Sequence, residues 1–209
     1  MARLRRRRRD DPAVSTVDPL PALYASPDDV SSPWRLLFGN DRPVEIEIGP
    51  GRGDVLLAFA AARPEVNFFA IEHVQGAAAH VAARLRTAGL PNARVLGADA
   101  VCVVGHLVPP ASVAAYHIYF PDPWPKSRHR KRRLVTPEFA AGMTRTLAPG
   151  GTVHVATDVG SLFDDIAQVL AAAGFAQRDD VRAPPRPTTR FETKYATTGT
   201  FAATFSPRR

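Results

Sequence analysis

The fold of this chain is decided by residues 44–54, which read VEIEIGPGRGD. Apolar, β-branched residues at alternate positions predict a strand over 44–48, and the strand runs directly into a glycine loop, Gly49 to Gly53. Glycine lets the backbone turn sharply and lets a ligand approach it closely. The dinucleotide pattern GxGxxG is not matched, because the third glycine comes one position early. The loop alone is therefore a weak indication of a nucleotide-like ligand.

Strands and helices alternate along the rest of the chain. The predicted strands are 44–48, 67–71, 93–97, 113–120 and 152–156, with weaker ones near 175–180 and 199–205. The predicted helices are 54–62, 75–88, 101–107, 136–147 and 161–173, and 149–151 (PGG) is predicted to be a tight turn. This alternation predicts an α/β fold with a doubly wound, mostly parallel sheet in a single domain. Ligands of such sheets bind beyond the carboxyl ends of the strands, where the strand order reverses.

Carboxylates follow the first three predicted strands. Glu47 lies just before the glycine loop, where it would repel a pyrophosphate but suits the ammonium and sulfonium groups of S-adenosylmethionine. Glu72 is placed to accept hydrogen bonds from ribose hydroxyls, and Asp99 from an adenine amino group. Each acid alone could instead cap a helix or face water, and Glu45 lies too near the start of its strand to be included. The cofactor-binding residues predicted from the loop and the strand ends are Glu47, Gly49, Gly51, Gly53, Glu72 and Asp99.

The segment after the fourth strand, residues 120–133, reads FPDPWPKSRHRKRR. Its prolines predict a rigid turn around Asp122 and Trp124. A fixed carboxylate, an aromatic ring and a basic run together are typical of proteins that bind looped or single-stranded RNA. Alternatively, Asp122 only stabilises the turn and Trp124 fills the core. The residues expected to contact RNA phosphates are Arg128, Arg130, Lys131, Arg132 and Arg133.

These segments resemble the bacterial tRNA (guanine-N7-)-methyltransferases. EIGPGRG, AIE, ADA, FPDPWPKSRHRKRR, PGG, ATD and TRFETKY occur in the family's order over roughly residues 44–205, and the FPDPW segment is the most specific of them. The resemblance implies a Rossmann-like class I methyltransferase fold, with a seven-stranded sheet whose last strand is antiparallel. We therefore expect the methyltransferase domain to span residues 41–209. The Arg-, Asp-, Pro- and Ser-rich composition of residues 1–40 predicts a flexible arm before it, with Trp34, Leu36, Leu37 and Phe38 as candidates to anchor its end on the core.

The resemblance further implies roles for individual residues. Glu47, Glu72 and Asp99 would contact S-adenosylmethionine, and Asp122 would be the catalytic or cofactor-proximal acid. The residues implied around the substrate guanine are Lys126, Asp158, Thr189, Arg190, Phe191 and Glu192. The acceptor is expected to be a guanine in the tRNA variable loop. Guanine N7 carries a lone pair and no proton, so no general base is required. We expect Asp122, Asp158 or Glu192 to bind the base edge, although Asp122 could instead face the cofactor.

Composition limits the setting in which the protein works. The 209 residues carry a net charge of +7, yet residues 3–9 and 126–133 each hold six Lys or Arg. The remainder has 15 basic and 20 acidic residues, so two basic patches sit on a mildly acidic body. This distribution favours a polyanionic partner, with nucleic acid the first candidate, and the alternative is that both runs are only solvated. The resemblance makes tRNA the expected partner. One cysteine excludes an internal disulfide, and we expect no metal. The Arg-rich start leads into Asp10 rather than an apolar stretch, so we expect a cytoplasmic protein without membrane contact, a monomer or homodimer.

Three other functions fit parts of the sequence. A nicotinamide-dependent oxidoreductase could use a similar loop, but the glycine spacing and Glu47 argue against it. A relative that binds RNA without catalysis would not need the acids that follow the strands. A methyltransferase acting on another RNA or on protein remains an alternative, since proline-flanked acids also occur in amino-methylating enzymes.

Overall fold

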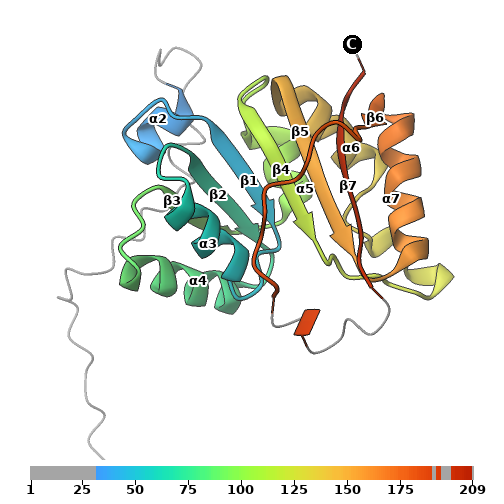
Figure 1. The fold of residues 1–209 in the computed structure, drawn as a ribbon, viewed down its shortest axis with the longest axis horizontal. Coiled ribbons are helices and arrows are strands. Elements are labelled where there is room, and N and C mark those ends of the chain that lie inside the picture. The colour runs from blue at the N-terminus through green and yellow to red at the C-terminus, as the bar shows by residue number, and fades with distance from the viewer. Residues whose placement is uncertain (1–31, 190–191, 194–198, 209) are drawn as a thin grey trace, which may run out of the picture.

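A computed structural model describes residues 32–189, 192–193 and 199–208 of the chain (Figure 1). The strands are β1 Val44–Ile48, β2 Asn67–Glu72, β3 Ala93–Gly97, β4 Val113–Tyr119, β5 Leu147–Thr157, β6 Phe175–Gln177 and β7 Phe201–Pro207. The α-helices are α2 Pro33–Phe38, α3 Asp54–Ala62, α4 Gln75–Thr87, α5 Ala100–Cys102, α6 Pro137–Thr146 and α7 Gly160–Ala172. A π-helical turn, Val103–Leu107, continues α5, and a 3-10 helix, Ser127–Arg132, follows β4.

The seven strands form one sheet in the order β3-β2-β1-β4-β5-β7-β6. Strands β1 to β5 pair in parallel, and β7 pairs antiparallel with both β5 and β6. The predicted sheet, including its antiparallel last strand, is confirmed. The chain runs outward from β1 to β3 and then returns to place β4 on the other side of β1. The strand order therefore reverses between β1 and β4, where ligands of this fold class bind.

Helices cover both faces of the sheet (Figure 1). One face packs against α2, α5, α6 and α7 in a core that includes Ile46, Phe139 and Leu162. The other face packs against α3 and α4 through residues such as Phe59 and Val81. The two cores arise because successive strand residues point to opposite faces, and apolar residues fill both sets of positions. Among the described segments, no helix is both long and apolar enough to cross a membrane.

The end of the predicted N-terminal arm is ordered into the core. Residues 33–38 form α2, in which Trp34 and Leu37 are buried, and the Trp34 indole donates a hydrogen bond to Ser112 Oγ at 3.0 Å. The Trp34 ring also packs on Phe69, with 5.4 Å between ring centroids. Residues 1–31 of the arm lie outside the described residues. The helix at 33–38 thus anchors the end of the arm on the core through Trp34 and Leu37, as the sequence predicts, whereas Leu36 is exposed.

The predicted turn at 149–151 lies inside a longer strand. β5 begins at Leu147, which pairs with Val113, and the next pair along the two strands joins Thr152 to Ala115. The extra residues of β5 form a bulge opposite β4. Gly151 has no room for a side chain, because a Cβ would lie 2.8 Å from Leu147 Cδ2 and 3.1 Å from the Val113 carbonyl oxygen. The glycines therefore bend the strand, and the helix that precedes it ends at Thr146.

Candidate functional site

A cleft of about 230 Å³ opens at the carboxyl ends of β1 and β4, where the strand order reverses. The residues that line it are Glu47, Gly49, Pro50, Gly51, Arg52, Asp54, Val55, Tyr119, Phe120 and Thr189. They come from β1, the glycine loop, the start of α3, the end of β4 and the segment after β6. The sequence-predicted glycine loop and Glu47 are therefore brought to one site.

The glycine loop is shaped by backbone conformations that other residues rarely adopt. Gly51 and Gly53 have φ angles of 57° and 79°. Gly53 also packs tightly, since a Cβ there would lie 3.0 Å from Val81 and 3.1 Å from Leu57. The Gly53 amide donates to the Pro50 carbonyl at 2.8 Å, which closes the turn before α3. The third glycine, one place early for a dinucleotide loop, thus permits close packing of α3 and α4.

Glu47 is the chemically unusual residue of the cleft. Its side chain is 5% exposed, and its Oε2 atom has no hydrogen-bond partner among the described residues. Burial and repulsion by Asp54 raise its pKa to about 8, while Arg186 acts in the opposite direction. A buried carboxyl without a partner costs free energy unless a ligand pairs with it. The cleft therefore offers one strong acceptor for a cationic or hydrogen-bond-donating group.

Glu72 and Asp99, the acids that follow the second and third predicted strands, already accept hydrogen bonds from backbone amides. Glu72 is 8% exposed, and its two carboxylate oxygens accept hydrogen bonds from the Val74 amide at 2.9 Å and the Gly51 amide at 3.3 Å. This carboxylate ties the glycine loop to the end of β2. Asp99 is exposed and caps α5 by accepting from the Cys102 amide at 3.0 Å. Neither residue is part of the cleft wall formed by Glu47 and the loop.

The proline-rich turn after β4 is strained and mostly half-buried. Phe120 and Trp124 have φ angles of 51° and 41°, which are costly for residues with side chains. Asp122 between them is exposed. Its carboxylate and that of Asp158, which follows β5, accept no hydrogen bond from any described residue. These two predicted acids therefore keep their full hydrogen-bonding capacity for a ligand.

Trp124 packs on the basic run rather than filling the core. The Arg132 guanidinium lies 4.9 Å from its ring centroid, and His129 meets the ring edge-on at 5.7 Å. Lys126, Arg128, Arg130, Lys131 and Arg132 are all exposed. This side of the molecule thus presents cations and a half-exposed aromatic ring directly after Asp122.

Arg133 differs from the other members of the basic run. Its side chain is only 11% exposed, and it forms an ion pair with Asp165 of α7. Its Nε donates to the Pro123 carbonyl at 3.0 Å. Arg133 therefore fastens the proline-rich turn to α7. These contacts occupy the guanidinium that was predicted to bind an RNA phosphate.

The described ends of the predicted substrate segment 189–192 are joined to each other. Thr189 lines the cleft, and Glu192 accepts hydrogen bonds from both the Thr189 amide and Arg186. Arg190 and Phe191 lie outside the described residues. Glu192 therefore holds Thr189, and each of its two oxygens already accepts a hydrogen bond.

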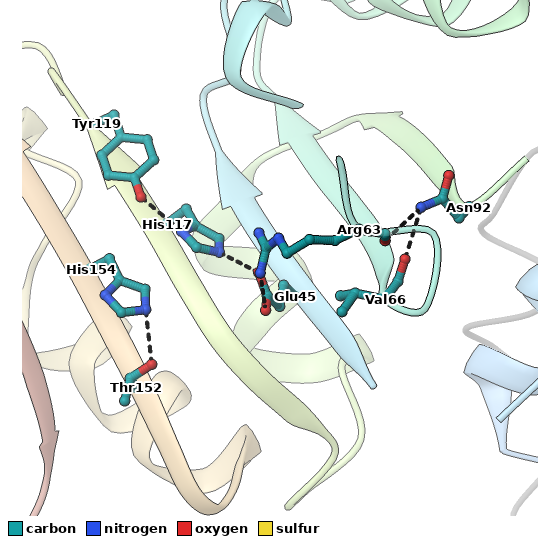
Figure 2. A network of polar contacts seen from close by, with 8 residues as sticks. All are labelled: Glu45, Arg63, Val66, Asn92, His117, Tyr119, Thr152 and His154. Carbon is teal, nitrogen blue, oxygen red and sulfur yellow. Dashed lines mark hydrogen bonds and ion pairs between the residues drawn. The ribbon is translucent and has the colours of Figure 1, made fainter. Parts of the chain in front are cut away.

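A polar layer lies below the cleft on the same face of β1, β4 and β5 (Figure 2). Glu45 bridges Arg63 and His117 Nε2, each at 2.8 Å. Since a carboxylate only accepts, His117 Nε2 donates, and neutral His117 Nδ1 accepts from the Tyr119 hydroxyl at 2.9 Å. His154 stacks on His117 with 5.1 Å between centroids. Because Tyr119 also lines the cleft, this layer supports one wall of the site.

The polar layer keeps its histidines neutral and its glutamate charged. Burial lowers the pKa of both His117 and His154, the latter to about 4. Burial opposes ionisation of Glu45, but His117 and Arg63 outweigh it, so the pKa of Glu45 is lowered. Glu45 was not among the predicted site residues. The polar layer could have been found from the sequence, because polar residues at alternate positions of neighbouring strands share one face of the sheet.

The order of the strands and the place of the glycine loop are those of the class I methyltransferase fold. Among solved structures, the 16S rRNA methyltransferase KamB is similar with a TM-score of 0.60 and 21% identity, covering 83% of this chain and 92% of that one. A SAM-dependent methyltransferase from Aquifex aeolicus has a TM-score of 0.56 and 16% identity, covering 90% of this chain and 97% of that one. At these identities the likeness concerns the fold alone.

Sequence comparisons identify the family. A family model described as "Putative methyltransferase" matches residues 41–203. The chain is 41% identical to a tRNA (guanine-N(7)-)-methyltransferase of Geobacter metallireducens over 71% of both chains. It is 40% identical to one of Bordetella pertussis over 75% of this chain and 63% of the relative. This chain belongs to the tRNA (guanine-N(7)-)-methyltransferase family, as its motifs indicated.

Proposed function

We propose that this protein transfers a methyl group from S-adenosylmethionine to N7 of a guanine in the variable loop of tRNA. The observation that carries the proposal is the buried, unpartnered carboxyl of Glu47 in the cleft at the end of β1. Membership of the family supports the reaction. The exposed basic run beside the cleft supports an RNA substrate.

The residues of the cleft fit S-adenosylmethionine better than a dinucleotide. Glu47 and Asp54 both line the cleft, so a pyrophosphate placed there would face two carboxyl groups. S-adenosylmethionine has an ammonium and a sulfonium group and no phosphate, and a cation relieves the unpartnered Glu47. The glycine loop would hold the rest of the cofactor, and Glu72 would fix that loop through the Gly51 amide. When bound, the cofactor supplies a methyl group on a sulfonium sulfur, which is already activated for transfer.

The chain's main task is then to place the guanine. Guanine N7 needs no general base, so alignment of N7 with the methyl group carries the catalysis, and such alignment can lower a barrier by ~7–11 kcal/mol. The purine becomes cationic as N7 is methylated, and its N1–H and amino group become stronger donors. A carboxylate bonded to them stabilises the transition state more than the ground state. Asp122 and Asp158, which have unused acceptors, are the residues proposed for that contact.

The tRNA would be held by the exposed cations after the proline-rich turn. Lys126, Arg128, Lys131 and Arg132 form no ion pair with the described residues, and Arg130 pairs with Asp165 at 3.7 Å but stays exposed. They are therefore available to phosphates, which dominate RNA-binding affinity and make it depend on salt. Trp124 adds an aromatic ring on which a base can stack.

The proposal is tested by incubating the protein with labelled S-adenosylmethionine and unmodified total tRNA, and then mapping the modified nucleotide. We expect one 7-methylguanosine in the variable loop. Glu47→Gln is the matched inactive variant. Label at another base or another position would contradict the assigned substrate, and label in protein but not tRNA would favour a different acceptor. Binding of NAD in preference to S-adenosylhomocysteine would overturn the cofactor assignment.

A further inference from the structure

The segment between β6 and β7 crosses the sheet without forming regular structure. Residues 178–189 contain no helix or strand, and they pass in front of the sheet before reaching the carboxyl ends of the strands (Figure 1). The Arg178 amide fixes the start of the segment by donating to the Thr204 carbonyl at 2.8 Å, and the residues after it depend on side-chain contacts for their position. Arg186 makes contacts with residues of the cleft wall.

Arg186 binds two aromatic rings at the end of β4. Its guanidinium carbon lies 5.0 Å from the centroid of Tyr119 and 5.0 Å from that of Phe120. Both rings belong to the cleft wall. The plane of a guanidinium can stack on aromatic rings while its edge donates hydrogen bonds, which an ammonium group cannot do. Arg186 is only 16% exposed, so these contacts are largely removed from water.

The edge of the same guanidinium holds Glu192 in a bidentate ion pair. Arg186 Nη1 donates to Glu192 Oε2 at 2.6 Å, and Nη2 donates to Oε1 at 2.8 Å. The Glu192 side chain is 11% exposed. Exposed ion pairs contribute little to stability, but a shielded, two-point pair fixes geometry as well as charge.

Glu192 in turn holds Thr189, which lines the cleft. Glu192 Oε2 accepts from the Thr189 amide at 2.8 Å and from its hydroxyl at 3.0 Å, while the Glu192 amide donates to Thr189 Oγ1 at 3.2 Å. This reciprocal pair is a capping box, which fixes the two residues relative to each other but not relative to the rest of the molecule. Arg186 connects the box to the rings of Tyr119 and Phe120 at the end of β4.

We propose that Arg186 is a positioning residue that holds Thr189 and Glu192 against Tyr119 and Phe120, and so sets the substrate side of the cleft. The inference rests on the proposed methyl transfer to tRNA. It assigns Glu192 to a structural unit with Arg186 rather than to direct contact with guanine. Loss of Arg186 then displaces Thr189 and Glu192 while leaving the glycine loop and Glu72 in place.

The test compares Arg186→Gln with Arg178→Gln in the full-length protein. Arg178 lies on the same segment and pairs with Asp180 at 2.6 Å, but it has no contact with the cleft. We expect Arg186→Gln to lower kcat for tRNA methylation by about 100-fold, as misplacement near 1 Å does elsewhere, with S-adenosylhomocysteine affinity within about threefold of wild type. Arg178→Gln should change neither quantity. Amide exchange at Thr189 and Glu192 should rise in Arg186→Gln only.

Two further variants sharpen the test: one separates the effect on the rate from an effect on folding, and the other shows whether Arg186 and Glu192 act together. Arg186→Lys keeps the charge but not the planar fork, so it should lose most of the rate while its melting temperature stays near that of wild type. Glu192→Gln combined with Arg186→Gln should be no worse than either change alone, because both act through one unit. An unchanged kcat in Arg186→Gln, an equal loss in Arg178→Gln, or multiplying losses in the double variant would each overturn the inference. A wild-type protein that methylates no tRNA would instead refute the proposed function.

Discussion

Glu47 and Glu192 are both glutamates that sequence analysis assigned to ligand binding, and their surroundings are opposite. Glu47 is buried with an oxygen that no described residue contacts. Glu192 has both oxygens occupied, by Arg186 and by Thr189. A carboxylate with an unused acceptor is available to a ligand, whereas one whose acceptors are filled holds the protein together. This difference in partners supports the proposed cofactor-binding role of Glu47 and a structural role for Glu192 at the same cleft.

The basic run shows the same contrast among cations. Lys131 is exposed and Arg128 meets only the neighbouring His129, whereas Arg133 is enclosed by Asp165 and the Pro123 carbonyl. The first two are available to phosphates, and the third anchors the turn that carries Asp122. Residues of one type in one short run thus divide by their partners into binding and structural groups.

The largest expected effect comes from removing the unpartnered carboxylate. Glu47→Gln should weaken S-adenosylhomocysteine binding by about 10- to 150-fold, the equivalent of ~1.5–3 kcal/mol for a hydrogen bond to a charged group. Its melting temperature should stay equal or rise, because a buried acid is removed. Titration calorimetry and thermal unfolding measure the two effects.

Glu192→Gln is the matched control for that comparison. It keeps the shape of the side chain but loses the ion pair with Arg186. We expect cofactor affinity to stay within about threefold of wild type while methylation of tRNA falls. If Glu192→Gln weakened cofactor binding more than Glu47→Gln, the division between the two glutamates would be wrong.

The next effect tests the exposed acid after β4. Asp122→Asn should lower kcat for tRNA methylation by about 100-fold, as loss of one oriented electrostatic contact does in other enzymes. Its melting temperature should not change, since Asp122 is exposed and makes no hydrogen bond with the described residues. Asp158→Asn serves as the comparison. Full activity in Asp122→Asn would remove this residue from the mechanism.

The pH dependence of cofactor binding follows from Glu47. Its pKa is raised to about 8 in the free protein, so it is mostly protonated at pH 7. A cationic ligand favours the carboxylate, so binding releases up to one proton and affinity should rise about tenfold per pH unit below pH 8. Calorimetry in buffers of different ionisation enthalpy counts that proton. Glu47→Gln should abolish the release, and a pH-independent wild type would contradict it.

The raised pKa of Glu47 also determines how the stability of the folded protein changes with pH. Since the pKa of Glu47 is higher in the folded protein than its ordinary value of 4.5, the folded state binds the proton more tightly. This contribution to stability is complete below pH 4.5 and is lost as the pH rises through 8. The stability difference between wild type and Glu47→Gln should therefore change over that interval.

The smallest expected effect is on the salt dependence of tRNA binding, and it distinguishes the exposed cations of the basic run from Arg133. Arg128→Gln with Lys131→Gln should reduce the slope of log affinity for tRNA against log salt by about 1.4–1.8, at 0.7–0.9 for each phosphate contact. Arg133→Gln should lower the melting temperature and leave the slope unchanged. Filter binding over a range of salt concentrations distinguishes them. A reduced slope in Arg133→Gln alone would reverse the two assignments.

The sheet and the glycine loop were predictable because their signals are local. Alternating apolar residues at 44–48 and the glycines after them depend on neighbours in the chain, and the strand and helix positions agree within a few residues. The bulge at the start of β5 was not predictable from the PGG motif, because it arises from pairing with β4.

The roles of individual charged residues were harder to predict, because they depend on distant partners. Arg133 pairs with Asp165, 32 positions away, and Glu45 pairs with His117, 72 positions away. Glu192 and Arg186 are only six positions apart, but their shared position on Tyr119 and Phe120 requires the fold. The type of residue therefore indicated which side chains were functional candidates. Which of them have hydrogen-bond acceptors or charges left for a ligand depends on partners that only the fold brings together.

The central claim is that the cleft beside Glu47 takes the methyl donor. A crystal structure with S-adenosylhomocysteine measures this most directly, because that ligand keeps the ammonium group of the donor. The account predicts the ammonium within hydrogen-bonding distance of a Glu47 carboxylate oxygen, with the glycine loop against the ligand. A ligand bound elsewhere, with both Glu47 oxygens still lacking a contact to it, would contradict the account.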